Sequence, residues 1–187
     1  IESLPNFQVF SPCQPTDVSN LIDKFFKRRK IENPVYLRLQ KGGENNLTEI
    51  YLPREDNEKF KYWEGNEILI VTHGAITEEA LKTRQNLNKN ISVGVISIIE
   101  WNKCTKLNLF KTFKKIIFLE ENRFVGSFAS KVLKNNTLLN KTNYKILCVE
   151  KADFDRNITR KYALDQNNLN HDKIEIEVIN LKNEEIK

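Results

Sequence analysis

The chain contains 187 residues, 40% of them hydrophobic, and carries a formal net charge of +5 with a pI near 9.0. This length fits one complete domain and part of another, and the apolar content excludes a chain that stays unfolded. The 30 basic residues are interspersed with 25 acidic ones. Because no nucleic-acid-binding motif accompanies them, we expect a solvated surface and no nucleic-acid partner.

The cysteines Cys13, Cys104 and Cys148 are odd in number, lie far apart and form no CxxC pair. This spacing argues against a metal site and predicts free, mostly buried thiols in a reducing compartment, hence a cytoplasmic location. No apolar stretch approaches the roughly 20 residues that span a bilayer, and no signal peptide opens the chain, so no membrane role is expected. The absence of Met and the start at Ile1 favour a truncated or processed N-terminus.

The first part of the chain predicts a strand, a helix and another strand. An apolar run at 7–10 favours the first strand, which stops at Ser11-Pro12. A helix opening near Pro15 or Thr16 follows, since apolar residues recur at steps of three and four. These residues are Val18, Leu21, Ile22, Phe25 and Phe26. Cations at 27–30 suit the helix C-terminus, and residues 35–39 after Asn33-Pro34 predict the second strand.

Composition changes between Lys41 and Asn66, where Gly, Asn, Pro and alternating charges dominate. Such a stretch is typical of a linker. We therefore expect the end of one α/β domain at 1–43, a linker at 44–66 and a second domain at 67–187. Phe60, Tyr62 and Trp63 are expected to begin the second domain as a small edge strand or docking segment.

Strands and helices alternate through the remainder. Apolar runs predict strands at 68–72, 91–99, 116–119 and 146–149. Helical patterns occupy 75–87, 107–113 and 126–133. Apolar strands separated by helices indicate a mainly parallel sheet covered on both faces. The end is ambiguous, because Ile174, Ile176 and Val178 alternate like a strand, whereas Ile174, Val178 and Leu181 share one helix face.

His73 and His171 are the only histidines. His73 follows a predicted strand and precedes Gly74, at the edge where α/β folds place ligands. No Ser, Cys or acidic partner beside it forms a recognisable nucleophilic motif, so a stand-alone enzyme that uses His73 ranks third among the possible functions. His171 lies in a polar run and is expected at the surface.

Glu120 and Glu121 follow a predicted strand and resemble a catalytic pair of carboxylates. Adjacent strand residues point to opposite faces, so the two side chains are not expected to converge. A structural role is favoured, such as capping the next helix or contacting a neighbouring subunit. Gly42-Gly43 and Gly74 belong to no G-x-G-x-x-G or GK[ST] loop, which argues against nucleotide binding.

Arg38 lies within an apolar strand, between Leu37 and Leu39, just before a glycine turn. A guanidinium in this place is either a partner in an ion pair at the core edge or a ligand for an anion at the strand's carboxyl end. Its rigid fork suits phosphate. The residues alone leave both interpretations open.

Several phrases, in this order, resemble the transketolase family of thiamine-diphosphate enzymes. LPNFQVFSP (4–12), the following helix and PVYLRLQKGGE (34–44) resemble the end of that family's pyrimidine-binding domain. The phrases that resemble its C-terminal domain are KYWEGNEILIVTHG (61–74), ISVGVISI (91–98), IIFLEENRFVGSFASKVL (116–133) and RKYALDQNNLN (160–170). The last of these resembles a short Tyr–x–Leu turn before a final helix, which favours a helix at the end of the chain.

The resemblance implies a three-layer α/β C-terminal domain with a mostly parallel five-stranded sheet, preceded by a partial α/β domain. Family members use thiamine diphosphate and a divalent metal, usually Mg²⁺, held by a GDG-type motif and activated by a glutamate in earlier parts of the enzyme. Neither motif occurs here, so we expect this chain alone to bind no cofactor and no metal and to contain no catalytic residue. By position, Arg38 corresponds to the strand-end arginine that contacts the substrate phosphate.

The function implied by the resemblance is that of the C-terminal portion of a transferase in carbohydrate metabolism, which moves a two-carbon ketol unit between sugar phosphates and is inactive alone. The expected partner is the N-terminal part of the same enzyme or a partner subunit, in a homodimer or heterotetramer. The alternative is a non-catalytic assembly or docking domain, similar to that of a 2-oxoacid dehydrogenase beta subunit.

Overall fold

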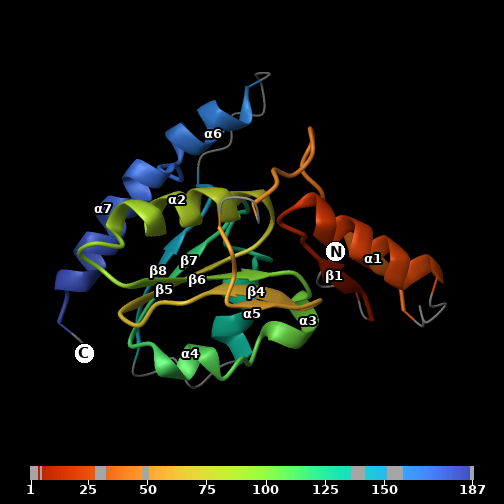
Figure 1. Ribbon diagram of the computed structural model, residues 1–187, viewed down its shortest axis with the longest axis horizontal. Helices are drawn as coiled ribbons and strands as arrows, with labels where there is room; N and C mark the ends of the chain where they lie inside the picture. The colour runs from red at the N-terminus through yellow and green to blue at the C-terminus, as the bar shows by residue number, and fades with distance from the viewer. Residues whose placement is uncertain are drawn as a thin grey trace.

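A six-stranded sheet lies at the centre of the computed structural model, which describes residues 4, 6–27, 33–47, 51–135, 142–150 and 158–185 (Figure 1). Its strands, in spatial order, are β3 (Glu55–Asp56), β4 (Phe60–Trp63), β6 (Val93–Ile98), β5 (Ile68–Thr72), β7 (Lys115–Leu119) and β8 (Asn143–Leu147). The last four run parallel, whereas β4 is antiparallel to both of its neighbours. The predicted mostly parallel sheet is confirmed, and the two-residue β3 adds a sixth strand to the expected five.

Helices cover both faces of this sheet and give the predicted three layers (Figure 1). One face packs against α2 (Thr77–Leu87) and α7 (His171–Asn183), and α6 (Arg160–Gln166) immediately precedes α7. The opposite face packs against α3 (Trp101–Cys104), α4 (Leu109–Thr112) and α5 (Phe128–Asn135). The helical interpretation of the chain's end is therefore confirmed by α7.

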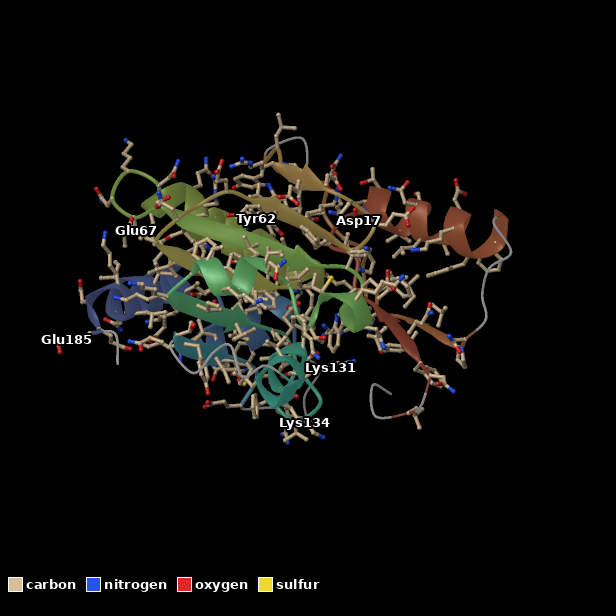
Figure 2. All side chains as sticks on the ribbon, turned by 90° about the horizontal axis from the view of Figure 1, so that it is seen from below. Asp17, Tyr62, Glu67, Lys131, Lys134 and Glu185 are labelled. Carbon is tan, nitrogen blue, oxygen red and sulfur yellow. The ribbon has the colours of Figure 1, made fainter. Side chains whose placement is uncertain are left out.

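The N-terminal segment forms a separate two-stranded parallel sheet, in which β1 (Gln8–Phe10) pairs with β2 (Val35–Leu37). The helix α1 (Pro15–Lys27) connects the two strands and begins, as predicted, at Pro15. Figure 2 shows Asp17 at the end of α1 that faces the main sheet. There its carboxylate lies 3.0 Å from the Lys61 ammonium of β4, and both side chains are buried.

The predicted apolar stripe of α1 is only partly covered. Leu21 and Phe25 pack with Phe10 and Ile99 in a small cluster of their own. Ile22 and Phe26 from the same stripe are 41% and 72% exposed. Cations were predicted at 27–30, in the last turn of this helix. Lys27 is the last residue of α1, and residues 28–30 lie outside the described residues. Among the described residues, therefore, none covers this side of α1 well enough to bury Ile22 and Phe26.

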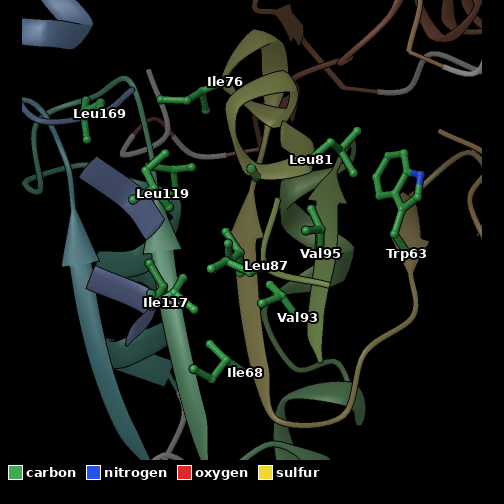
Figure 3. Close-up of a cluster of buried hydrophobic side chains, with 14 of the residues drawn as sticks. Trp63, Ile68, Ile76, Leu81, Leu87, Val93, Val95, Ile117, Leu119 and Leu169 are labelled. Carbon is green, nitrogen blue, oxygen red and sulfur yellow. The ribbon is translucent and has the colours of Figure 1, made fainter. Parts of the chain in front are cut away.

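The core follows the alternation of side chains along the strands. Ile68 and Ile70 point to the α2–α7 face, while Leu69 and Val71 point to the α3–α5 face. Figure 3 shows Val93 and Val95 of β6 beside Leu87 and Leu81 of α2. Since these strands are buried on both faces, their sequences are apolar throughout and lack the alternation of a half-exposed sheet.

Most elements differ from their predicted bounds by a residue or two, and four differences go further. The helix expected at 75–87 is split into a 3-10 turn, η1 (Gly74–Ile76), and α2, because Gly74 has a positive φ of 66° and turns the chain sharply. The strand expected at 146–149 is β8, which starts earlier through the polar Asn143 and Lys145, since backbone pairing with β7 does not require apolar side chains. The four-residue α3 was not predicted, because it is too short to show hydrophobic periodicity. The helix α6 forms where a turn was expected.

All three cysteines are free, as predicted, with Cys13 and Cys104 buried and Cys148 partly so. Burial, with the Glu100 carboxylate adding to it, raises the pKa of the Cys104 thiol to about 12. Neutral, enclosed thiols of this kind are unreactive and act as small apolar groups. Among the described helices, none combines the length and apolar character that crossing a membrane requires.

Candidate functional site

His73 and Glu120 come from the carboxyl ends of two neighbouring parallel strands. β5 and β7 are paired so that Thr72 lies opposite Leu119, and the residue that follows each strand therefore emerges at the same edge of the sheet. The His73 Nε2 atom lies 2.9 Å from Glu120 Oε2. Both residues are 1% exposed, so they form a buried pair at the edge where α/β folds place ligands.

Glu120 also holds the start of helix α5. Its carboxylate accepts hydrogen bonds from the backbone amides of Phe128 at 2.9 Å and Ala129 at 2.7 Å. Burial alone would raise the pKa of Glu120, but the hydrogen bond to His73 and the two amides outweigh it and hold the pKa below the usual range. The predicted helix-capping role of Glu120 is therefore confirmed.

Glu120 and Glu121 diverge, as expected of neighbours at a strand end. Whereas Glu120 is enclosed, the Glu121 carboxylate is directed toward helix α6 and accepts a hydrogen bond from Arg160 Nε at 2.6 Å. The two carboxylates thus have separate partners and form no acid–base pair.

Arg38 reaches this cluster from the end of β2. Its backbone amide donates to the Phe10 carbonyl at 2.8 Å, which continues the pairing of β2 with β1. Its guanidinium nitrogen Nη1 lies 3.3 Å from His73 Nδ1, and Nη2 donates to the Glu121 carbonyl at 3.2 Å. Within the described part of the chain, the guanidinium contacts a ring nitrogen and a backbone carbonyl and forms no ion pair with a carboxylate. Its positive charge is thus left without a direct counter-charge.

A cavity of about 360 Å³ opens beside Arg38. Three cationic side chains line it, Arg38, Lys41 and Arg160, together with the carboxylates Glu44 and Glu121. The Glu121 carboxylate accepts a hydrogen bond from Arg160, and the Glu44 carboxylate accepts one from the backbone amide of Gln40 at 2.8 Å. The cavity can therefore accommodate an anionic group against Arg38.

The His73 ring packs against one aromatic side chain, which a second aromatic side chain holds in place. The Trp101 and His73 rings have centroids 4.6 Å apart and are tilted by 55°. Trp101 is in turn held by Phe128, edge to face at 5.7 Å. The imidazole is therefore packed on its ring face as well as hydrogen-bonded at both nitrogens, which limits its rotation.

The other histidine, His171, lies partly exposed at the surface, as expected, and has an acidic partner that the polar sequence around it does not reveal. His171 is half-buried, and both its backbone amide and its Nδ1 atom contact the Glu79 carboxylate, at 2.8 and 2.9 Å. Glu79 belongs to α2 and His171 begins α7, so this pair joins the two helices. The pair is separate from the Arg38–His73–Glu120 cluster.

The acidic partner of His73 is the functional residue that sequence reasoning missed. Glu120 lies 47 positions later in the chain, so no local motif contains both residues. A usable signal exists nonetheless, since each of the two residues directly follows a buried apolar strand. Once β5 and β7 are placed side by side, His73 and Glu120 must be neighbours.

A cofactor that binds through a divalent metal needs several metal ligands close together. Among them, no group of three or more His, Cys, Asp or Glu side chains is arranged to hold a metal ion. The described residues thus do not bring together the donors that a divalent metal needs.

The sequence of this chain is similar to known proteins of one family. The family described as transketolase, C-terminal domain, matches residues 61–174. An uncharacterized transketolase family protein of Sinorhizobium fredii is 30% identical over 97 residues, which cover 51% of this chain and 27% of the relative. A 1-deoxy-D-xylulose-5-phosphate synthase of Lawsonia intracellularis is 26% identical over 145 residues, 72% of this chain and 22% of the enzyme. The chain thus spans about a quarter of the length of these curated relatives.

Two solved structures share the fold. A split-gene transketolase, described as an inactive beta4 tetramer, has a TM-score of 0.72 and 24% identity, over 97% of this chain and 59% of that chain. A transketolase from Campylobacter jejuni has a TM-score of 0.64 and 12% identity, over 95% of this chain and 27% of that chain. With most of the main sheet and its covering helices inside the matched range, this chain belongs to the transketolase C-terminal domain family.

Proposed function

We propose that this chain is the rear portion of a thiamine-diphosphate-dependent enzyme of the transketolase type, which transfers a two-carbon ketol unit between sugar phosphates and is inactive without its remaining part. The proposal divides the chain into the end of a pyrimidine-binding domain at 1–43, a linker at 44–66 and the C-terminal domain at 67–187. The second half of that range contributes β3 and β4 to the main sheet, where β4 pairs with β6.

The small N-terminal sheet supports the proposal of a further partner. Parallel strands normally lie in larger sheets that are covered on both faces, whereas β1 and β2 pair only with each other in the sheet that the described residues form. On α1, Phe26 remains largely exposed. We propose that the preceding part of the enzyme, or a partner subunit, adds strands and a covering layer here. The split-gene transketolase of similar fold is described as a tetramer, which supports assembly of this chain with other subunits. The assembly we propose is a homodimer or a heterotetramer in the cytoplasm.

The observation that carries the proposal is that the Arg38 guanidinium forms no ion pair with a carboxylate among the described residues. The Arg38 guanidinium contacts a ring nitrogen and a carbonyl oxygen. Since neither contact is with a carboxylate, its positive charge stays available to a ligand. It borders a cavity that Lys41 and Arg160 also line. We propose that Arg38 binds the phosphate of a phosphorylated sugar through its planar fork, which matches phosphate oxygens in geometry and charge.

Thiamine diphosphate with Mg²⁺ would supply the chemistry that makes and breaks the carbon–carbon bond in the complete enzyme. In this proposal both are held by the remaining part, because the described residues assemble no metal-ligand set. The role of this chain is to complete the fold, brace the assembly and present Arg38 to the substrate.

Replacing Arg38 by Ala in the assembled enzyme should raise the KM for phosphorylated sugars about 10- to 100-fold, the range expected when a hydrogen-bonded charge contact of about 1.5–3 kcal/mol is lost. The KM for the matching unphosphorylated sugars should change little. Arg54→Ala is the control, because Arg54 is 59% exposed and pairs only with Glu64 among the described residues. Equal increases for both classes of sugar would remove the phosphate role of Arg38.

A further inference from the structure

We infer that His73 and Glu120 are positioning residues for Arg38: the carboxylate fixes the protonation of the imidazole, and the imidazole fixes the orientation of the guanidinium. The inference rests on the proposed function, in which Arg38 is the anion ligand. It gives a role to a buried histidine that neither the packing of the core nor the capping of α5 requires. Neither residue touches the substrate in this account, so both act through Arg38.

The hydrogen-bond donors and acceptors determine which nitrogen of His73 carries its proton. An arginine side chain only donates hydrogen bonds, so the contact of 3.3 Å between Arg38 Nη1 and His73 Nδ1 requires Nδ1 to accept. A neutral imidazole with a free Nδ1 carries its proton on Nε2. That Nε2–H then donates to Glu120 Oε2 at 2.9 Å, which is possible because an ionised carboxylate only accepts.

Each member of this chain of contacts is itself held in place. The Glu120 carboxylate is anchored by the amides of Phe128 and Ala129 in the first turn of α5. The His73 side chain is fully buried and packs against the Trp101 ring. If the imidazole flipped or shifted its proton to Nδ1, two donors would face each other at Arg38, and Glu120 would lose its bond from the ring. The contacts with Arg38 and Glu120 therefore favour one tautomer and one position of the guanidinium. In that tautomer Nε2 donates to Glu120, and the longer approach of Asn122 Nδ2 to Nε2, at 3.4 Å, is not a hydrogen bond.

A neutral imidazole is well suited to this task for an electrostatic reason. A carboxylate in direct contact with Arg38 would orient the guanidinium but would also neutralise much of its charge. Here the imidazole separates Arg38 from the Glu120 carboxylate, and the second contact of Arg38 is the Glu121 carbonyl. Of the two carboxylates that line the same cavity, Glu121 is engaged by Arg160 and Glu44 accepts a hydrogen bond from the Gln40 backbone amide. Arg38 is thus oriented by two neutral acceptors while its charge is kept for an anion.

The first test uses the unaltered, ¹⁵N-labelled 187-residue chain. Long-range ¹H–¹⁵N NMR spectra distinguish protonated from unprotonated ring nitrogens, and they should show His73 with its proton on Nε2 and a free Nδ1 at neutral pH. A proton on Nδ1 would overturn the inference, since Nδ1 could then accept nothing from Arg38. No substitution is involved, so misfolding of a variant cannot affect this result.

The second test compares two substitutions of His73 in the assembled enzyme. His73→Gln keeps an amide donor near the place of Nε2 but loses the acceptor for Arg38, so the KM for phosphorylated sugars should rise about ten-fold with a smaller change in kcat. His73→Asn can place its amide oxygen near Nδ1 and should restore most of that loss. His171→Gln is the matched control, because His171 also contacts a glutamate at 2.9 Å and lies in a separate pair.

The outcomes separate this inference from the proposed function. If Arg38→Ala raises the KM selectively but His73→Gln behaves like His171→Gln, the positioning role is wrong and the phosphate role stands. If Arg38→Ala has no selective effect, the proposed function fails and this inference fails with it. A selective loss in His73→Gln that His73→Asn restores, together with the Nε2–H tautomer, is the result that the inference predicts.

Discussion

Replacing Glu120 by Ala should lower the free energy of unfolding by about 3–5 kcal/mol, because three buried donors lose their acceptor and each unsatisfied donor costs about 1–3 kcal/mol. These donors are the amides of Phe128 and Ala129 and the ring N–H of His73. The loss of the cap also weakens the first turn of α5. Chemical denaturation, followed by circular dichroism, measures the difference directly.

Glu55→Ala provides the matched control, since Glu55 lies exposed on the short strand β3 and its removal should change the stability by no more than about 0.5 kcal/mol. If Glu120→Ala and Glu55→Ala gave the same small loss, the buried network around Glu120 would not contribute to stability in the way described.

The stabilisation by Glu120 should also depend on pH in a definite direction. Its pKa in the folded chain lies below the ordinary value of 4.5, because the hydrogen bonds of His73 and the amides outweigh burial, which acts in the opposite direction. A group with a depressed pKa stabilises the fold above its unfolded pKa, and this contribution is lost as the pH falls through its folded pKa. The advantage of the natural chain over Glu120→Gln should therefore be full above about pH 4.5 and shrink below it.

Replacing Asp17 by Ala should cost about 3–5 kcal/mol, because breaking one partner out of a buried ion pair leaves the other charge enclosed. The Lys61 ammonium lies 3.0 Å from Asp17, and the two side chains are only 3% and 2% exposed. Asp17 also accepts from the backbone amide and the thiol of Cys13, at 3.1 and 3.3 Å. Because the pair joins α1 to β4, hydrogen exchange should show the greatest loss of protection in α1.

A double variant distinguishes the ion pair from general damage to the core. Asp17→Ala combined with Lys61→Met removes both charges, so the double variant should be more stable than the sum of the two single losses predicts, by about 1–3 kcal/mol. Asp56 contacts the same ammonium from a more exposed position, and Asp56→Ala should cost less than Asp17→Ala. Strictly additive losses would show that Asp17 and Lys61 are not coupled.

Most of the fold could be predicted from the sequence because its core strands are buried on both faces. Runs such as Ile68–Thr72 are apolar throughout, and the glycines and helical patterns between them leave few arrangements other than a parallel sheet. Short or edge elements were harder to predict. β8 forms through backbone pairing along partly polar residues, and α3 comprises a single turn, so hydrophobic periodicity does not reveal either of them.

The candidate site could be predicted only in part, for a different physical reason. Arg38 and Glu120 each stand out locally, one as a charge inside an apolar strand and the other as a carboxylate before a helix. Their connection through His73 depends on which strands are neighbours, and pairing of distant strands leaves no mark in the local sequence. The contact of His171 with Glu79 was missed for the same reason, because Glu79 lies 92 positions earlier in the chain.

The most direct test of the central claim is the binding of thiamine diphosphate in the presence of Mg²⁺, measured by isothermal titration calorimetry. The measurement compares this chain alone, the remaining part of the enzyme alone and an equimolar mixture of the two. Our account predicts saturable binding only by the mixture, since the cofactor site is completed by residues outside this chain. A mixture that forms a stable complex yet binds no thiamine diphosphate, or this chain binding it equally well alone, would contradict the account.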